Sequence, residues 1–241
     1  MDEKEFYDHS DAFQRSATAE APLTAWRRLA NRHTADRFQR ALMMLETGQD
    51  FLELGCGGGE LCALAMKRYS TVHGIDIASR RLEEARSLCS SAGRPEQVGQ
   101  FLVGNLNDPC PFPDGSLDSI AAISVLEHVF DVYSFVRDCR RLLRPSGILL
   151  IEVPNLAYLK NRLRLLFGNL PITSSPYGWA DGFGWDGGHL HYFTKNAITN
   201  LLTGEGFEVK SIVESRAAFA NQRSYWVSLL AGNFLIKAAK T

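Results

Sequence analysis

The residues with the clearest chemical meaning are a run of glycines and an acidic residue that follows it. Residues 53–60 read Glu-Leu-Gly-Cys-Gly-Gly-Gly-Glu, directly after a short apolar run. Glycines allow the backbone to turn sharply and allow a ligand to approach the main chain without interference from a Cβ atom. Asp76 ends the next apolar run, about 21 residues beyond Gly55, where a carboxylate accepts both hydrogen bonds of a ribose diol. Together the two features predict that a nucleoside-containing ligand lies across the turn.

The residue types around the turn also discriminate between cofactors. A dinucleotide fingerprint, G-x-G-x-x-G, needs a third glycine at position 60, where this chain has Glu60. A carboxylate there opposes a pyrophosphate at the helix N-terminus, which disfavours NAD, and no GK[ST] follows for a P-loop. S-adenosyl-L-methionine (SAM) has no phosphate but carries a sulfonium and an ammonium cation, so Glu53 beside the turn suits it. We therefore predict SAM as the cofactor.

The elements that hold this turn alternate between strand-like and helix-like patterns. Short apolar runs predict strands, and apolar residues at helical spacing predict the helices between them. The predicted strands cover 50–54, 71–77, 100–103, 117–123 and 147–153. Of the three predicted helices, the first begins near residue 60, and the others cover 79–90 and 132–143. This alternation is typical of a parallel sheet with helices on both faces. We expect an α/β fold in which a doubly wound, Rossmann-like sheet of seven strands is mostly parallel.

The second half of the chain supplies an insertion and the last two strands. An amphipathic basic stretch precedes a long loop rich in Gly, Pro and aromatic residues, so we interpret 154–193 as an acceptor-side insertion, or lid, after the fifth strand. Thr194 is predicted to cap a helix that ends near residue 203. Residues 207–214 are predicted as a strand, and the tail, 233–240, as a last edge strand that returns antiparallel.

Four segments, taken as a set, resemble the successive motifs of class I SAM-dependent methyltransferases. They read LELGCGGGE, GID, PFPDGSLDSIAAISVLEHV and LLRPSGILLIEVPN, and the resemblance covers about residues 50–155. It implies methyl transfer from SAM, with S-adenosyl-L-homocysteine as the product. Carried over position by position, it implies that Asp76 binds the ribose, that Ile77 flanks the adenine, and that the methionine moiety is lined by Gly55, Gly57 and Gly59.

The same resemblance extends to later positions of the domain. Asn105 stands where many relatives have an aspartate facing the adenine amino group, with Leu106 beside it, and an amide oxygen also accepts that hydrogen bond. Ile123 and Ser124 match positions at the methionine end of SAM, although Ile123 also reads as a core residue. The segment LEHV, at 126–129, belongs to a motif shared with ubiquinone-biosynthesis O-methyltransferases, where a structural role competes with a catalytic one.

The later part of the chain resembles MetW-like proteins and related small-molecule methyltransferases, less specifically, up to about residue 208. Its segment HLHYFT carries two histidines, and an imidazole of near-neutral pKa suits a base that takes a proton from a hydroxyl or an ammonium. We predict His189 and His191 as catalytic and prefer His189, since alternate residues of an extended segment point in opposite directions. Both also read as structural residues of the lid. Asp186 would complete a metal site with them, but we predict no metal.

Composition excludes several classes of partner. The formal net charge of -1 provides none of the basic excess that marks a nucleic-acid surface. The N-terminus lacks a signal-peptide pattern and no apolar run approaches the roughly 20 residues of a membrane span, so we expect a cytoplasmic protein without membrane contact. Five cysteines form no CxxC pair and are interpreted as reduced thiols. We divide the chain into an N-terminal helical segment, 1–48, and a methyltransferase domain, 49–241.

The sequence leaves two functions of different classes open. The first is a SAM-dependent methyltransferase that transfers a methyl group to an oxygen or nitrogen atom of a small-molecule acceptor. The second is a MetW-like accessory protein that binds an acyltransferase of methionine biosynthesis and does not catalyse methyl transfer. Neither the acceptor nor the oligomeric state can be derived from these residues, and a homodimer is one of the states that they allow.

Overall fold

The computed structural model describes residues 37–173, 188–215 and 224–241, which build a seven-stranded sheet with helices packed against it. Most of the predicted N-terminal segment, the centre of the predicted lid and Asp186 lie outside these ranges. Among the described residues, no helix is both long and apolar enough to cross a lipid bilayer.

The sheet consists of five parallel strands, extended on one side by two more strands, the first of which is antiparallel to its neighbours. Its strands are β1 (Gly48–Leu54), β2 (Tyr69–Asp76), β3 (Val98–Val103), β4 (Leu117–Ile123), β5 (Leu143–Pro154), β6 (Phe207–Glu214) and β7 (Asn233–Lys240). In space they follow the order β3-β2-β1-β4-β5-β7-β6. Strands β1 to β5 run parallel to one another, and β7 runs antiparallel to both β5 and β6. The predicted α/β fold, with a doubly wound and mostly parallel sheet of seven strands, is confirmed.

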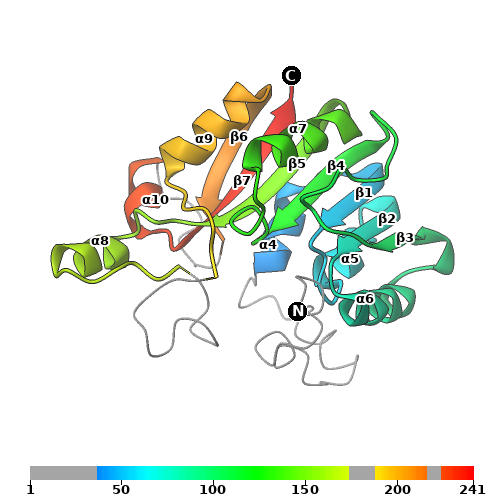
Figure 1. Ribbon diagram of the computed structural model, residues 1–241. Helices are drawn as coiled ribbons and strands as arrows, with labels where there is room; N and C mark the ends of the chain where they lie inside the picture. The colour runs from blue at the N-terminus through cyan, green and yellow to red at the C-terminus, as the bar shows by residue number, and fades with distance from the viewer. Residues whose placement is uncertain (1–36, 174–187, 216–223) are drawn as a thin grey trace.

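Helices cover both faces of this sheet. They are α4 (Arg37–Met44), α5 (Glu60–Ala65), α6 (Ser79–Ala92), α7 (Val132–Leu142), α8 (Leu159–Leu166), α9 (Lys195–Gly204) and α10 (Ser224–Leu230), with a short 3₁₀ turn, η2, at Pro95–Gln97. Residues of α7 and α9 join one buried cluster, and residues of α4, α5 and α6 join the other. Figure 1 shows α7 and α9 together on the near face of the sheet.

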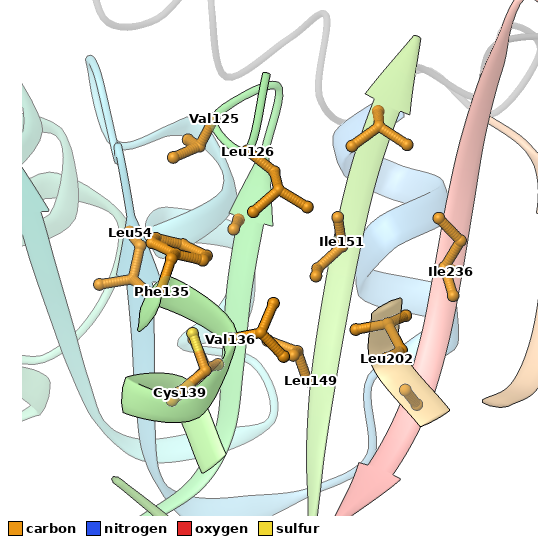
Figure 2. Packing of buried hydrophobic residues seen from close by; sticks show 14 of the residues in the cluster. Leu54, Val125, Leu126, Phe135, Val136, Cys139, Leu149, Ile151, Leu202 and Ile236 are labelled. Carbon is orange, nitrogen blue, oxygen red and sulfur yellow. The ribbon is translucent and has the colours of Figure 1, made fainter. Parts of the chain in front are cut away.

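The two clusters arise because neighbouring strand residues point to opposite faces. On β1, Leu52 and Leu54 enter the cluster beneath α7, whereas Phe51 enters the cluster beneath α5 and α6. Leu150 on β5 likewise faces away from both of its neighbours. Figure 2 shows the first cluster, with side chains of α7 lying over Leu54 on one strand and Leu149 on another. Parallel strands that are buried on both faces read as continuous apolar runs, which is why the sequence reveals them.

Helix and strand boundaries agree closely with the local sequence signals. The predicted strands at 117–123 and 207–214 match β4 and β6. Thr194 caps α9 as predicted, because its Oγ1 accepts a hydrogen bond from the backbone N–H of Ala197 at 3.2 Å. Residues 144–147, which lie between the predicted helix at 132–143 and the predicted strand at 147–153, form an irregular start of β5, where Ser146 has a φ of 61° and the pairing with β4 shifts register.

The position of the last strand differs from its prediction. The tail does return antiparallel at 233–240, but β7 lies between β5 and β6, so β6 and not β7 forms the edge of the sheet. The physical reason is burial. Phe234, Leu235 and Ile236 are all buried, which requires cover on both faces, whereas β6 is mostly half-buried and tolerates an open side.

Candidate functional site

The topology itself marks one place at the carboxyl edge of the sheet. Strands β1 and β4 are neighbours there, yet β1 continues into α5 on one face and β4 leads to α7 on the other. Figure 1 shows the chain diverging from the two strand ends. In open α/β sheets a crevice for ligands forms at such a switch point, outside the carboxyl ends of the strands. The loops that follow β1 and β4 therefore define the candidate site.

The loop after β1 is the predicted glycine turn, and its geometry explains the glycines. Gly55, Gly57 and Gly59 have φ values of 69°, 51° and 82°, in the left-handed region that favours glycine. A Cβ atom on Gly55 would lie 2.4 Å from Cγ2 of Val125, and one on Gly59 would lie 2.8 Å from Cα of Ala85. The turn is therefore pressed against the loop after β4 and against α6.

Asp76 fixes the outer side of the same turn. Its Oδ2 accepts a hydrogen bond from the backbone N–H of Gly57 at 2.8 Å, and its Oδ1 accepts one from Ala78 at 2.9 Å. Each carboxylate oxygen has a second lone pair, so the group retains acceptor capacity towards a bound diol. The main chain thus holds the half-buried carboxylate in one orientation before a ligand arrives. Ribose binding by Asp76 remains a prediction.

Glu53 lies beneath the turn. The side chain is buried, and Oε2 accepts hydrogen bonds at 3.1 Å from both the backbone N–H and the thiol of Cys62. Because Cys62 is in the first turn of α5, the carboxyl group satisfies a helix N–H that has no partner within the helix. Burial raises the pKa of Glu53 well above its ordinary value, and the hydrogen bond from Cys62 opposes that shift only in part.

The predicted adenine side is formed by two loops. Ile77 is half-buried after β2, and Leu106 packs against the edge of the cluster beneath α7. Oδ1 of Asn105 accepts hydrogen bonds from the backbone N–H and the side-chain amide of Asn107, at 3.0 and 2.9 Å. Asn107 in turn accepts a bond from the N–H of Phe130, so the loop after β3 is tied to the loop after β4. The oxygen of Asn105 that was predicted to face adenine is engaged locally.

Ile123 and Ser124, the two residues predicted at the methionine end of SAM, have different environments at the end of β4. Ile123 is buried in the cluster beneath α5, which agrees with the core alternative. Ser124 has a φ of 57°, an uncommon and strained value for a residue with a side chain. Its Oγ donates to Glu152 at 3.3 Å, and its backbone N–H donates to the carbonyl of Glu152 at 3.1 Å.

Sequence reasoning missed the residues that surround Ser124. Glu152 is fully buried at the end of β5, and its Oε2 lies 3.5 Å from Nη1 of Arg37. Its other oxygen accepts a hydrogen bond from the amide of Asn233 at 3.1 Å. A glutamate inside the apolar run LLIEVPN was a visible signal, because an acidic residue is almost never buried without a partner. The identity of the partners was not visible, since they come from distant parts of the chain.

A second acidic residue meets two histidines beyond the end of β4. Glu127 is 1% exposed, and no other described residue donates a hydrogen bond to its carboxyl oxygens. Burial raises the pKa of Glu127 to about 8; the residue's own backbone N–H and the charge of Arg37 oppose the rise, and the nearby Glu152 adds to it. Potential ligand atoms of Glu127, His128 and His189 all lie within 4.8 Å of one another, and the two imidazole rings meet edge to face at 4.9 Å. The structure thus unites the LEHV segment with the first predicted catalytic histidine.

The two predicted catalytic histidines diverge, as expected for alternate residues of an extended segment. Nδ1 of His189 lies 2.7 Å from Oγ1 of Thr173. The ring of His191 instead approaches the carbonyl oxygen of Phe130, with Nε2 at 3.2 Å. His189 therefore belongs to the cluster with Glu127, and His191 lies outside it.

Comparison with known proteins places these features in context. Residues 52–151 match a protein family described as a methyltransferase domain. A ubiquinone biosynthesis O-methyltransferase of Paracidovorax citrulli is 37% identical over 101 residues, which cover 42% of this chain and 41% of that protein. A probable S-adenosylmethionine-dependent methyltransferase of Mycolicibacterium smegmatis is 35% identical over 163 residues, covering 68% of this chain and 53% of that protein. The chain therefore spans about half, or less, of the length of these curated relatives.

The fold is shared with a solved protein over most of the chain. The crystal structure of a SAM-dependent methyltransferase from Mesorhizobium loti covers 85% of this chain and 98% of its own, with a TM-score of 0.61 and 20% identity. At that identity, the likeness concerns the fold alone.

Proposed function

We propose that the chain is a class I SAM-dependent methyltransferase that transfers a methyl group from SAM to an oxygen or nitrogen atom of a small-molecule acceptor, a proposal supported by the match of residues 52–151 to a methyltransferase domain family. One observation carries the cofactor assignment. Asp76 is held by the N–H groups of Gly57 and Ala78 directly beside a turn of three glycines in left-handed conformation. This arrangement would present an oriented carboxylate to a ribose beside the glycine turn.

The choice of a small acceptor is supported from two sides. One curated relative is named for O-methylation in ubiquinone biosynthesis, which concerns a small molecule, although the likeness covers less than half of either chain. The formal net charge of -1 argues against a nucleic-acid acceptor. We place the reaction in the cytoplasm, where the five buried and unpaired cysteines stay reduced.

Methyl transfer from a sulfonium is an in-line displacement, so the main contribution of the protein is alignment. The acceptor atom supplies the electron pair of the new bond to carbon, and the electrons of the carbon–sulfur bond stay on sulfur. A hydroxyl or ammonium acceptor must also lose a proton. His189 is the better placed of the two predicted bases, since it lies beside His128 and Glu127 near the end of β4, and Thr173 holds its Nδ1.

Calorimetric titration of the full chain with SAM, S-adenosylhomocysteine and NAD tests the cofactor assignment. We expect SAM and S-adenosylhomocysteine to bind and NAD not to bind. Asp76→Ala should weaken SAM binding at least about 10-fold, because it removes charge-assisted hydrogen bonds to the ribose. Glu83→Ala, which removes an exposed carboxylate from α6, is the matched control and should leave affinity unchanged. Binding of NAD without SAM would refute the proposal.

Turnover tests the second part. The chain, incubated with SAM and a panel of phenols, catechols, sugars and primary amines, should release S-adenosylhomocysteine with at least one acceptor. His189→Ala should lower that rate at least about 100-fold with SAM affinity retained. Tight SAM binding without release of S-adenosylhomocysteine on any acceptor, together with co-purification of an acyltransferase, would favour an accessory protein instead.

A further inference from the structure

We propose that Glu127, His128 and His189 form a binding site for a divalent first-row transition metal ion, and that this ion holds the acceptor beside the cofactor. The first part stands on the geometry of the three residues. The second part rests on the proposed methyltransferase function. The set differs from the three-residue metal site considered from sequence, because His191 and Asp186 are not among its members.

The buried carboxyl group of Glu127 is the strongest evidence for a cation site. It is 1% exposed, and no other described residue donates a hydrogen bond to Oε1 or Oε2. Buried polar groups are nearly always satisfied, and burying an unpaired carboxylate is highly unfavourable, so such a group calls for a specific explanation. A bound cation provides one, since it would supply both the missing partner and the compensating charge.

The two imidazoles complete a recognisable donor set. Ligand atoms from all three residues lie within 4.8 Å of one another, which gathers three potential metal ligands around one point. Two imidazoles and one carboxylate suit first-row transition ions such as zinc, manganese, iron and cobalt, whereas magnesium and calcium prefer oxygen donors throughout. Three protein ligands also leave coordination positions open, as in catalytic metal sites.

The surrounding structure holds the ligands in place. Oγ1 of Thr173 engages Nδ1 of His189 at 2.7 Å, which assigns metal binding to Nε2 of that ring. A hydrogen bond to the second ring nitrogen is the usual means by which proteins orient a metal-binding histidine. The backbone N–H groups of Leu190 and His191 donate to the carbonyl oxygen of Glu127 at 2.9 and 3.2 Å, and so attach the two ligand-bearing segments to each other.

The cluster also lies on the correct side of the cofactor turn for a role in the reaction. Glu127 and His128 follow Val125, whose side chain would be 2.4 Å from a Cβ atom at Gly55. The loop that carries two of the ligands is therefore packed against the turn predicted to hold the methionine end of SAM. An ion bound by this loop would place an acceptor oxygen on the side of the turn where the methyl group is predicted to lie.

Methyl transfer at such a site would need no reactant other than the acceptor, SAM and solvent water. A metal ion held by the three residues would lower the pKa of a bound acceptor hydroxyl, so that its O–H bond would break and its proton would pass to solvent water. The resulting oxyanion uses its electron pair to form the bond to the methyl carbon. The carbon–sulfur bond breaks with its electrons on sulfur, which leaves neutral S-adenosylhomocysteine. This arrangement replaces the role of His189 as a base, because its imidazole would hold the ion and the ion would acidify the acceptor.

Metal titration of the full, chelator-treated chain tests the site directly. We expect one equivalent of Zn²⁺ to bind by calorimetry, and one equivalent of Co²⁺ to give visible absorption bands that report its ligands. Glu127→Gln and His189→Gln should each weaken Zn²⁺ binding by at least about 100-fold, since loss of an outer-shell partner alone costs 10–100-fold. Thr173→Val, which removes such a partner, should weaken it about 10-fold. His191→Gln is the matched control from the same segment and should bind Zn²⁺ as the unmodified chain does.

The outcomes separate this inference from the proposed function. Absence of stoichiometric Zn²⁺ binding, or equal affinity in the Glu127, His189 and His191 variants, would overturn the metal site while leaving SAM binding and methyl transfer intact. Metal binding that depends on Glu127 and His189 in a chain that does not bind SAM would support the site and refute the methyltransferase proposal. Restoration of turnover by Co²⁺ or Mn²⁺ after chelation would support the role of the ion in the reaction.

Discussion

The two edges of the central sheet differ in how many hydrogen bonds their buried or partly buried carboxyl groups receive. At the amino edge, Asp118 of β4 accepts hydrogen bonds from the backbone N–H groups of Gln49 and Asp50, at 2.7 and 2.8 Å, and from Arg144 at 2.6 Å. Arg144 also pairs with Asp50 at 3.0 Å, which links the starts of three strands. Every acceptor in this network meets a donor supplied by the fold, so its role is to stabilise the sheet.

The carboxyl edge instead carries a carboxyl group whose hydrogen-bonding capacity the fold does not meet, since no other described residue donates a hydrogen bond to Glu127. Left-handed residues also gather there, in the glycine turn and at Ser124, whereas the amino edge has Ser146. Such features persist only where the rest of the structure stabilises them, and they concentrate at functional sites. The comparison supports the proposal that one edge stabilises the fold and the other binds ligands. Three substitutions test this division of roles.

The largest expected effect is at the glycine turn. Gly59→Ala should lower the free energy of unfolding by about 3 kcal/mol, since it adds left-handed strain and forces a Cβ atom to within 2.8 Å of the backbone of Ala85. SAM binding should be lost with it, because α5 can no longer begin where the turn requires. Denaturant unfolding and calorimetry measure the two effects.

A matched control separates strain from overlap. Gly115 has a similar φ of 60°, but a Cβ atom there would meet nothing within 4 Å. Gly115→Ala should therefore lower stability by only about 1 kcal/mol and leave SAM binding unchanged. Equal effects of the two substitutions would show that packing against α6 does not constrain the turn.

The next effect in size is at the amino edge. Asp118→Ala should lower the free energy of unfolding by about 2 kcal/mol, because two backbone N–H groups and Arg144 lose a charged acceptor that is 27% exposed. Asp114→Ala should cost less than about 1 kcal/mol, since Asp114 is 77% exposed and its pairing with Arg141 is a surface interaction. Neither substitution should alter SAM affinity. A loss of affinity in Asp118→Ala would contradict the division of roles between the edges.

The Asp118 effect should also depend on pH. Partial burial alone would raise the pKa of Asp118, but the N–H groups of Asp50 and Gln49 and the guanidinium of Arg144 outweigh it and lower the pKa below its ordinary value. A carboxyl group with a lowered pKa in the folded state stabilises the fold above its unfolded pKa of about 3.9, and this contribution is lost as the pH falls below that value. The difference between the unmodified chain and Asp118→Ala should be constant from pH 7 to about 5 and shrink below pH 4.

The same contrast explains what the sequence can predict. The strands, the glycine turn and the cap at Thr194 follow from local patterns, since each depends on neighbours in the chain. The interior position of β7 depends on which strand receives cover on both faces. The meeting of Glu127 with His189 likewise depends on the tertiary fold, because the two residues are far apart in sequence. LEHV and HLHYFT were each identified as chemically suggestive, but only the structure brings them together.

The smallest effect should have the opposite sign to the other two. Glu127→Met replaces a buried carboxyl group by an apolar side chain of similar length, so the metal-free chain should gain about 1 kcal/mol in free energy of unfolding. Zn²⁺ binding should disappear in the same variant. Gains in stability that accompany loss of function are typical of ligand-binding residues that the fold does not need. Chemical denaturation in the presence of a chelator measures the change, and a loss above about 1 kcal/mol would mean that Glu127 supports the fold as Asp118 does. In that case the carboxyl edge would share the structural role of the amino edge, and the assignment of Glu127 as a metal ligand would rest on the metal titration alone.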